Sequence, residues 1–281
     1  MRALAEFIMR GRVQASVVAL IGSWFPLISP ATVALVSLRH GTLDGIMILL
    51  WALLPALVTF WMSEMSPLMP MVTITGFAVT LSAAQLLRNG ASWSQTLMGL
   101  VAISCLIGGC FGIAMPEPIQ QITQLLNEML VEFEKNGQVL PALSETFVIG
   151  LISYVIAASS LLSLLLARWW QSLLYNPGGF QQEFHQMRLT PPQALLCVGI
   201  AFFCWLQAGD LQTWLGLVML PLQMVGLAIA HYAVKARNLG KQWLVMLYLG
   251  MLLVGPITVL LGIIAVFDSW TNLRARIPPK S

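Results

Sequence analysis

VQASVVALIGSWFPLISPATVALVSL, residues 13–38, is the stretch of sequence that decides the fold. It is long enough to cross a membrane as one helix, which needs about 20 apolar residues. Pro26 and Pro30 interrupt it near its middle, where a proline removes a helical hydrogen bond and clashes with the preceding turn. The stretch therefore predicts either one broken span or a hairpin of two short helices.

The composition of the whole chain is that of a membrane protein. Of its 281 residues, 58% are hydrophobic and 9% are charged, and the mean hydropathy is +0.83. Soluble domains carry about 25% charged residues. We expect residues 1–281 to form a single integral membrane domain, with the lipid bilayer as its first partner and no contact with nucleic acid.

About eight long apolar runs follow one another along the chain, and they predict an all-α, polytopic transmembrane helix bundle. Like the first run, the last contains a breaker at its middle, Gly255-Pro256, and it could be one span or a hairpin. The runs are 13–38, 44–62, 67–87, 94–115, 142–167, 192–208, 211–234 and 243–268.

The distribution of positive charge favours a hairpin for the first run. If the first and last runs were single spans, the 14 Lys and Arg residues would divide equally between the two sides of the membrane. If each is a hairpin, all of them except Lys135 lie on one side, as the positive-inside rule requires of the cytoplasm. We expect a bacterial inner-membrane protein with both termini in the cytoplasm. Trp24-Phe25 stands where a signal-peptide cleavage site would need small residues, so the first run is expected to be retained.

Residues 117–136 carry apolar side chains at helical spacing and predict an amphipathic helix on the external face. Its polar side is acidic, which matches anionic lipid headgroups poorly. The helix could lie flat at the interface or cover an external cavity.

The second segment between spans, 168–192, is predicted to be a cytoplasmic loop. It combines interfacial aromatic residues with an Asn-Pro-Gly-Gly turn. Such a loop could dock a membrane or cytoplasmic protein partner, or it could be an aromatic belt followed by a tight turn. The candidate docking residues are Arg168, Trp169, Trp170, Tyr175, Asn176, Pro177, Gly178, Gly179 and Phe180.

Catalytic chemistry is not indicated. Every charged residue lies at or near the end of an apolar run, and the chain contains no P-loop, GxSxG or HExxH motif. The four cysteines lie in apolar runs without a CxxC pair, so no metal or cofactor is predicted. The neutral polar residues within the runs could bond neighbouring helices or contact a small polar ligand. The ligand candidates are Ser153, Tyr154, Ser159 and Gln223.

Two further patterns have structural readings. Ala15/Ala19 and Gly108/Gly112 are pairs of small residues that let helices approach closely. A basic cluster marks the cytoplasmic boundary of a span, or binds a phosphate-bearing lipid or a partner. It consists of His231, Lys235, Arg237 and Lys241.

Three motifs resemble the YybS-like family of uncharacterised bacterial membrane proteins. They are the segment 167–180 (ARWWQSLLYNPGGF), the pieces 231–233 (HYA) with 241–244 (KQWL), and Asp268-Ser269-Trp270 with Arg274. More distantly, residues 13–115 are similar to the S-components of energy-coupling-factor importers and to the rod-shape protein MreD. The spans after residue 190 depart from the six-helix plan of S-components.

The YybS-like resemblance implies a family and a membrane location rather than a reaction. Our leading hypothesis is a non-enzymatic protein that binds a small ligand or a partner complex through an S-component-like bundle. Residues 117–136 would then cover the external mouth, and the 168–192 loop would face cytoplasmic machinery. One alternative is an MreD-like scaffold in envelope assembly or cell shape. A second is a lipid-modifying membrane enzyme that uses His231 and Lys235.

Overall fold

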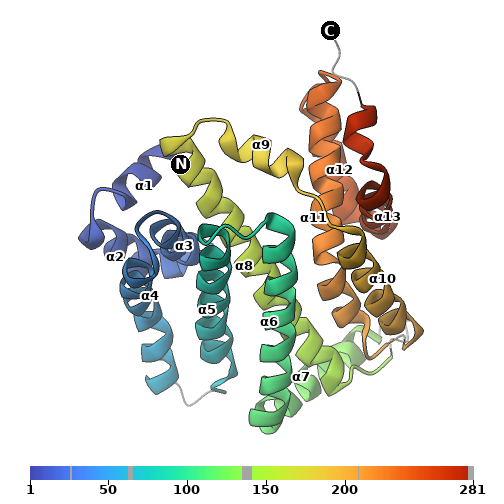
Figure 1. The fold of residues 1–281 in the computed structure, drawn as a ribbon. Coiled ribbons are helices and arrows are strands. Elements are labelled where there is room, and N and C mark those ends of the chain that lie inside the picture. The colour runs from blue at the N-terminus through green and yellow to red at the C-terminus, as the bar shows by residue number, and fades with distance from the viewer. Residues whose placement is uncertain (26, 63–65, 135–140, 208, 278–281) are drawn as a thin grey trace.

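A computed structural model describes residues 1–25, 27–62, 66–134, 141–207 and 209–277, and all regular secondary structure in these ranges is helical (Figure 1). The elements in chain order are α1 (Arg2–Ile8), α2 (Arg12–Ile21), the 3-10 turn η1 (Gly22–Trp24), α3 (Ile28–His40), α4 (Thr42–Met62), α5 (Leu68–Arg88), α6 (Trp93–Ala114), α7 (Pro116–Glu134), α8 (Glu145–Tyr175), α9 (Gly179–Gln186), α10 (Pro191–Leu206), α11 (Gln212–Ala236), α12 (Gln242–Leu253), α13 (Gly255–Thr271) and the 3-10 turn η2 (Leu273–Arg276).

The first apolar run is divided into two short helices. The chain reverses after η1 at Leu27, whose φ of 71° lies in the left-handed region that a bulky side chain rarely adopts. Arg12 at the start of α2 pairs with Asp44 at the start of α4, with 2.8 Å between Nη2 and Oδ1. Because α3 leads directly into α4, the two ends of the α2–α3 hairpin lie at the same end of the bundle. Pro26, one of the two breakers, lies outside the described residues.

Among the residues that the structure describes, five helices are long and apolar enough to span a membrane, namely α4, α5, α6, α8 and α11. Two bent pairs raise the number to seven if each is one span: α9 with α10, bent by 67°, and α12 with α13, bent by 116°. The expected count of about eight spans is therefore not confirmed. Helices α2 and α3, of 10 and 13 residues, are each too short to cross alone, at about 1.5 Å of rise per residue.

The long helix α8 is the centre of the bundle. It packs against α3, α5 and α6 on one side and against α11 on the other, while α11 in turn packs against α10 and α13. Ser144 caps the first turn of α8 by accepting a hydrogen bond from the Phe147 N–H at 3.2 Å. Figure 1 shows α9 arching over one end of the bundle, from the α1–α6 part to the α10–α13 part.

That end of the bundle carries the basic side chains of the spans. Arg88 donates to the carbonyl oxygens of Ser37 and Leu38 at 3.1 and 3.2 Å. Arg39 lies over the ring of Tyr175, 4.2 Å from its centroid. The opposite end carries α7, the last turn of α4 and the first turn of α5 (Figure 1).

A buried charge cluster holds the end of α13. Asp268 is fully buried and pairs with Arg274 at 3.0 Å, and it also accepts from the Leu273 N–H at 2.8 Å. Arg188 donates to the carbonyl oxygens of Asp268 and Ser269, both at 3.0 Å. The cluster fixes α13 to the segment between α9 and α10.

Candidate functional site

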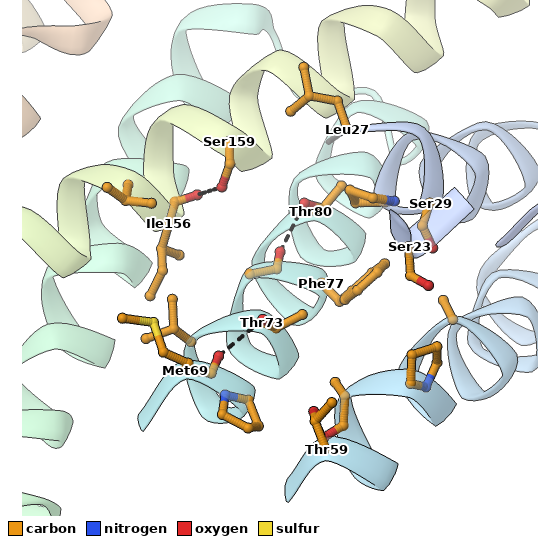
Figure 2. Close-up of a pocket in the computed structure, with 18 of the residues that line it drawn as sticks. Ser23, Leu27, Ser29, Thr59, Met69, Thr73, Phe77, Thr80, Ile156 and Ser159 are labelled. Carbon is orange, nitrogen blue, oxygen red and sulfur yellow. Dashed lines mark hydrogen bonds between the residues drawn. The ribbon is translucent and has the colours of Figure 1, made fainter. Parts of the chain in front are cut away.

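A cavity of about 1160 Å³ lies between α4, α5 and α8 (Figure 2). This volume is slightly above the range of about 300–1000 Å³ that is usual for small-molecule sites. The α2–α3 hairpin closes one end of the cavity, and three residues of α7, Gln121, Ile122 and Leu125, line the other.

The cavity exists because α3 is short. Helix α3 fills the space between α4, α5 and α8 at the basic end of the bundle. Beyond its first residues, the chain turns back through η1 into α2. Beyond the start of α3, the space between α4, α5 and α8 therefore contains no helix. The tip of the α2–α3 hairpin bounds this space at one end.

The described part of the lining is uncharged, and it carries hydroxyl groups on three helices. None of the described residues that line the cavity is Asp, Glu, Lys, Arg or His. Thr59 comes from α4, Thr73 and Thr80 from α5, and Ser159 and Ser163 from α8. Figure 2 shows α8 with Ser159 and α4 with Thr59 on opposite sides of the cavity, with α5 between them.

These hydroxyl groups donate their hydrogens to backbone carbonyl oxygens of their own helices. Thr59 donates to Ala56 at 2.9 Å, Thr73 to Met69 at 3.0 Å and Thr80 to Gly76 at 2.9 Å. Ser159 and Ser163 do the same on α8. Since each of these hydroxyls keeps its oxygen lone pairs, the five offer hydrogen-bond acceptors to the cavity.

Most of the other lining residues are apolar, and the exceptions are Ser23, Ser29, Ser66 and Gln121. Phe77 and Ile156 are buried apolar residues of the lining, at 5% and 1% exposure. Pro55 lies inside α4 and faces the cavity, at a position where a proline removes a helical hydrogen bond. An apolar enclosure with a few polar groups is the usual composition of a small-ligand site.

Helix α7 is fastened beside the cavity. Ile119 and Thr123 are buried, and α7 packs on α6 and α8. The Asn127 side chain donates to the Leu143 carbonyl at 3.0 Å and accepts from its N–H at 2.7 Å. The predicted helix 117–136 thus corresponds to α7, with residues 135 and 136 outside the described residues.

One of the four ligand candidates lines the cavity. Ser159 faces it, whereas Ser153 packs into the notch at Gly108 of α6 and Tyr154 lies against Gly216 of α11. Gln223 is on α11, which contributes no described residue to the lining.

Sequence reasoning missed Thr59, Thr73 and Thr80 as lining residues. Each is a hydroxyl residue within a predicted span, but they belong to two helices, and no spacing along the chain relates them to the serines of α8. The sequence marks these hydroxyl residues only by the absence of charged residues around them.

Three side chains of the candidate docking loop, Arg168, Trp170 and Phe180, make contacts inside the protein itself. Arg168 makes a bidentate pair with Glu183 at 2.9 and 2.7 Å, and Trp170 is fully buried. Phe180 packs edge-on against Trp93 of α6, with the ring centroids 6.3 Å apart. Trp169, Tyr175, Asn176, Pro177 and Gly178 are exposed, and Gly179 is buried.

The small-residue pairs pack helices of this chain against each other. Ala15 and Ala19 are buried, and the Ala19 carbonyl accepts from the Ser29 hydroxyl at 2.5 Å. A Cβ added at Gly108 would lie 1.9 Å from Ser153 Oγ, and one at Gly112 would lie 2.9 Å from Ile149 Cδ1. Helices α6 and α8 therefore approach closely at both glycines.

The predicted basic cluster is spread over the end of α11. His231 Nε2 lies 2.9 Å from the Tyr248 hydroxyl, and Lys235 donates to Gln181 at 2.8 Å. Arg237 and Lys241 are exposed beyond the helix. In the described part of the chain, no three His, Cys, Asp or Glu residues are placed to hold a metal ion.

Comparisons with protein-family models, with curated proteins and with solved structures found no match to this chain.

Proposed function

We propose that this integral membrane protein binds a small uncharged ligand in the cavity between α4, α5 and α8. The observation that carries the proposal is that the described lining residues are uncharged and bring hydroxyl groups from three helices. A charged ligand would lose its hydration there without gaining a counter-charge, which costs several kcal/mol per charge.

The cavity faces the outside of the cell in this proposal. The basic residues Arg12, Arg39, Arg88 and Arg168 gather at the end of the bundle opposite the cavity's α7 end. The positive-inside rule assigns that end to the cytoplasm. Helix α7 then lies on the external surface, beside the mouth of the cavity.

Binding is favoured over a scaffold role because Arg168, Trp170 and Phe180, from the loop expected to dock a partner, are used in contacts within the chain. The Ala15/Ala19 pair is buried as well, so it offers no surface of the kind by which S-components pack on a partner. An enzymatic role for His231 and Lys235 is less favoured, because the two side chains bond to separate partners, Tyr248 and Gln181, and neither residue lines the cavity. Membership of the YybS-like family stays a prediction from the quoted motifs.

Native mass spectrometry of the protein released directly from its membrane tests the proposal. We expect a bound molecule of constant mass on the unaltered chain. Ser159→Phe places an aromatic ring in the cavity and should remove that molecule. Leu162→Phe is the matched control, because Leu162 is on the same helix, is 50% exposed and does not line the cavity.

If the unaltered protein carries no molecule, or if Ser159→Phe and Leu162→Phe retain it equally, the proposal is wrong. The thermal unfolding midpoint of both variants in detergent shows whether the substitutions leave the bundle folded.

A further inference from the structure

We infer that the ligand is a neutral amphiphile with a hydrogen-bond-donating head, and that it enters the cavity sideways from the outer leaflet, between α4 and α8. The inference rests on the proposed function, since it names the ligand class and the route for the same cavity.

The cavity has a side without a wall. Its described lining residues come from the α2–α3 hairpin, α4, α5, α7 and α8, with Ser66 just before α5. Helix α5 packs against both α4 and α8 and forms the back of the cavity. Helices α4 and α8 are bridged by α3 at the basic end, and beyond α3 no described element stands between them on the side opposite α5. The opening therefore faces sideways, in the plane of the membrane.

The opening lies in the external half of the bilayer. With about 1.5 Å of rise per residue, Trp24 lies roughly 18 Å along the hairpin from Arg12, near the middle of a core about 30 Å thick. The lining residues of α4 begin at Ala52 and end at Met62, roughly 15 to 30 Å from the start of that helix at Thr42. Val155 lies roughly 20 Å from Arg168 along α8.

The rim of the opening is apolar. Trp24 and Phe25, at the tip of the hairpin, are 85% and 59% exposed, and Val155 on α8 is 48% exposed. All three line the cavity. Lipid chains would cover such a rim, and a water-soluble molecule would have to leave water to pass it. A molecule already dissolved in the outer leaflet could pass the rim without leaving water.

The lining selects the head of such a molecule. The hydroxyls of the lining on α4, α5 and α8 keep their lone pairs and donate their hydrogens to carbonyl oxygens of their own helices. They can accept from an alcohol or an amide. A phosphodiester or a carboxylate would bring acceptors and a negative charge, and none of the described lining residues is a cation that could pair with either. The ligand class is therefore an alcohol or amide attached to an apolar chain or ring system.

Photolabelling in vesicles tests the ligand class and the route together. The full chain is reconstituted in phosphatidylcholine vesicles that contain a monoacylglycerol with a diazirine in its acyl chain. A phosphatidylglycerol with the same photoreactive chain is the comparison probe. We expect the monoacylglycerol to label peptides that carry the lining residues of α4, α5 and α8, about fivefold more than the phosphatidylglycerol does. Equal labelling by the two probes, or labelling only of outward-facing residues such as those of α10, would overturn the ligand class.

Val155→Trp narrows the opening, and Leu162→Trp is its control on the same face of α8. We expect Val155→Trp to lower labelling of the lining about fivefold and Leu162→Trp to leave it unchanged. Val155→Ala widens the opening and should retain or increase the labelling, so the route stays testable if the tryptophan variant does not fold. Unchanged labelling in Val155→Trp, or reduced labelling in Val155→Ala, would overturn the sideways route.

The two proposals can fail separately. If the purified protein retains a molecule that Ser159→Phe removes, but the monoacylglycerol does not label the lining, the cavity is a binding site and the inferred class is wrong. If no molecule is retained and no probe reaches the lining, the proposed function fails as well.

Discussion

Replacing Gly226 by alanine should separate α11 from α13 and destabilise the bundle. A Cβ at this buried position would lie 2.3 Å from the Leu261 carbonyl oxygen and 2.7 Å from its carbonyl carbon. These are backbone atoms, so the clash is relieved only if the helices move apart by about 1 Å. Overpacking of this kind costs about 1–3 kcal/mol, and the better helix propensity of alanine returns up to about 1 kcal/mol. The expected net loss is about 1–2 kcal/mol.

The assay is the midpoint of thermal unfolding in mild detergent, followed by tryptophan fluorescence. For a chain of this size, 1 kcal/mol corresponds to about 2–4 °C, so the midpoint of Gly226→Ala should fall by roughly 2–8 °C. Gly216→Ala is the control on the same helix, because its Cβ would meet only the Tyr154 ring, at 3.6 Å. A midpoint for Gly226→Ala at or above that of Gly216→Ala would refute the close approach of α11 and α13.

Three further predictions concern the charges and the orientation. Asp268→Asn leaves Arg274 buried without its counter-charge and should lower the free energy of unfolding by about 3–5 kcal/mol. The midpoint of thermal unfolding should then decrease by on the order of 10 °C. A decrease of less than about 2 °C would contradict the buried pair. Burial, helped by the positive charge of Lys235, lowers the pKa of His185 to about 4, so the folded state resists protonation and stability is lost as the pH falls from about 6.5 to about 4. His185→Gln should make the midpoint less sensitive to pH over that window, and an unchanged pH dependence contradicts this role. The orientation is tested with Gln124→Cys on α7 and Pro177→Cys, each in a chain without other cysteines. A membrane-impermeant maleimide added to intact cells should react with Gln124→Cys but not with Pro177→Cys. The reverse pattern would contradict the proposed orientation.

Features that depend on nearby residues could be predicted from the sequence. The prolines at the middle of the first run predicted its division, and the structure places α2 and α3 on either side of a reversal there. Gly255-Pro256 predicted a break in the last run, and α12 meets α13 there at a bend of 116°. In both cases the signal is local, because a proline cannot donate the hydrogen bond that continues a helix. The number of spans was less predictable, since it depends on how the short pieces tilt and fold back.

The composition of the cavity could not be predicted in the same way. Ser153, Tyr154 and Ser159 lie within two turns of α8, yet they face α6, α11 and the cavity respectively. Helical periodicity relates residues on one helix, but it does not say which neighbour each face meets. The cavity itself results from a helix that ends early, so its lining could be assigned only after α3 was placed between α4, α5 and α8.

The most direct test of the binding proposal is an experimental structure of the protein purified from its native membrane without ligand exchange. We expect non-protein density between Thr59, Thr73 and Ser159, continuous with the opening beside Val155 and with no ion beside it. A cavity closed by the side chains of α4 and α8, with no space for a ligand between them, would contradict the proposal.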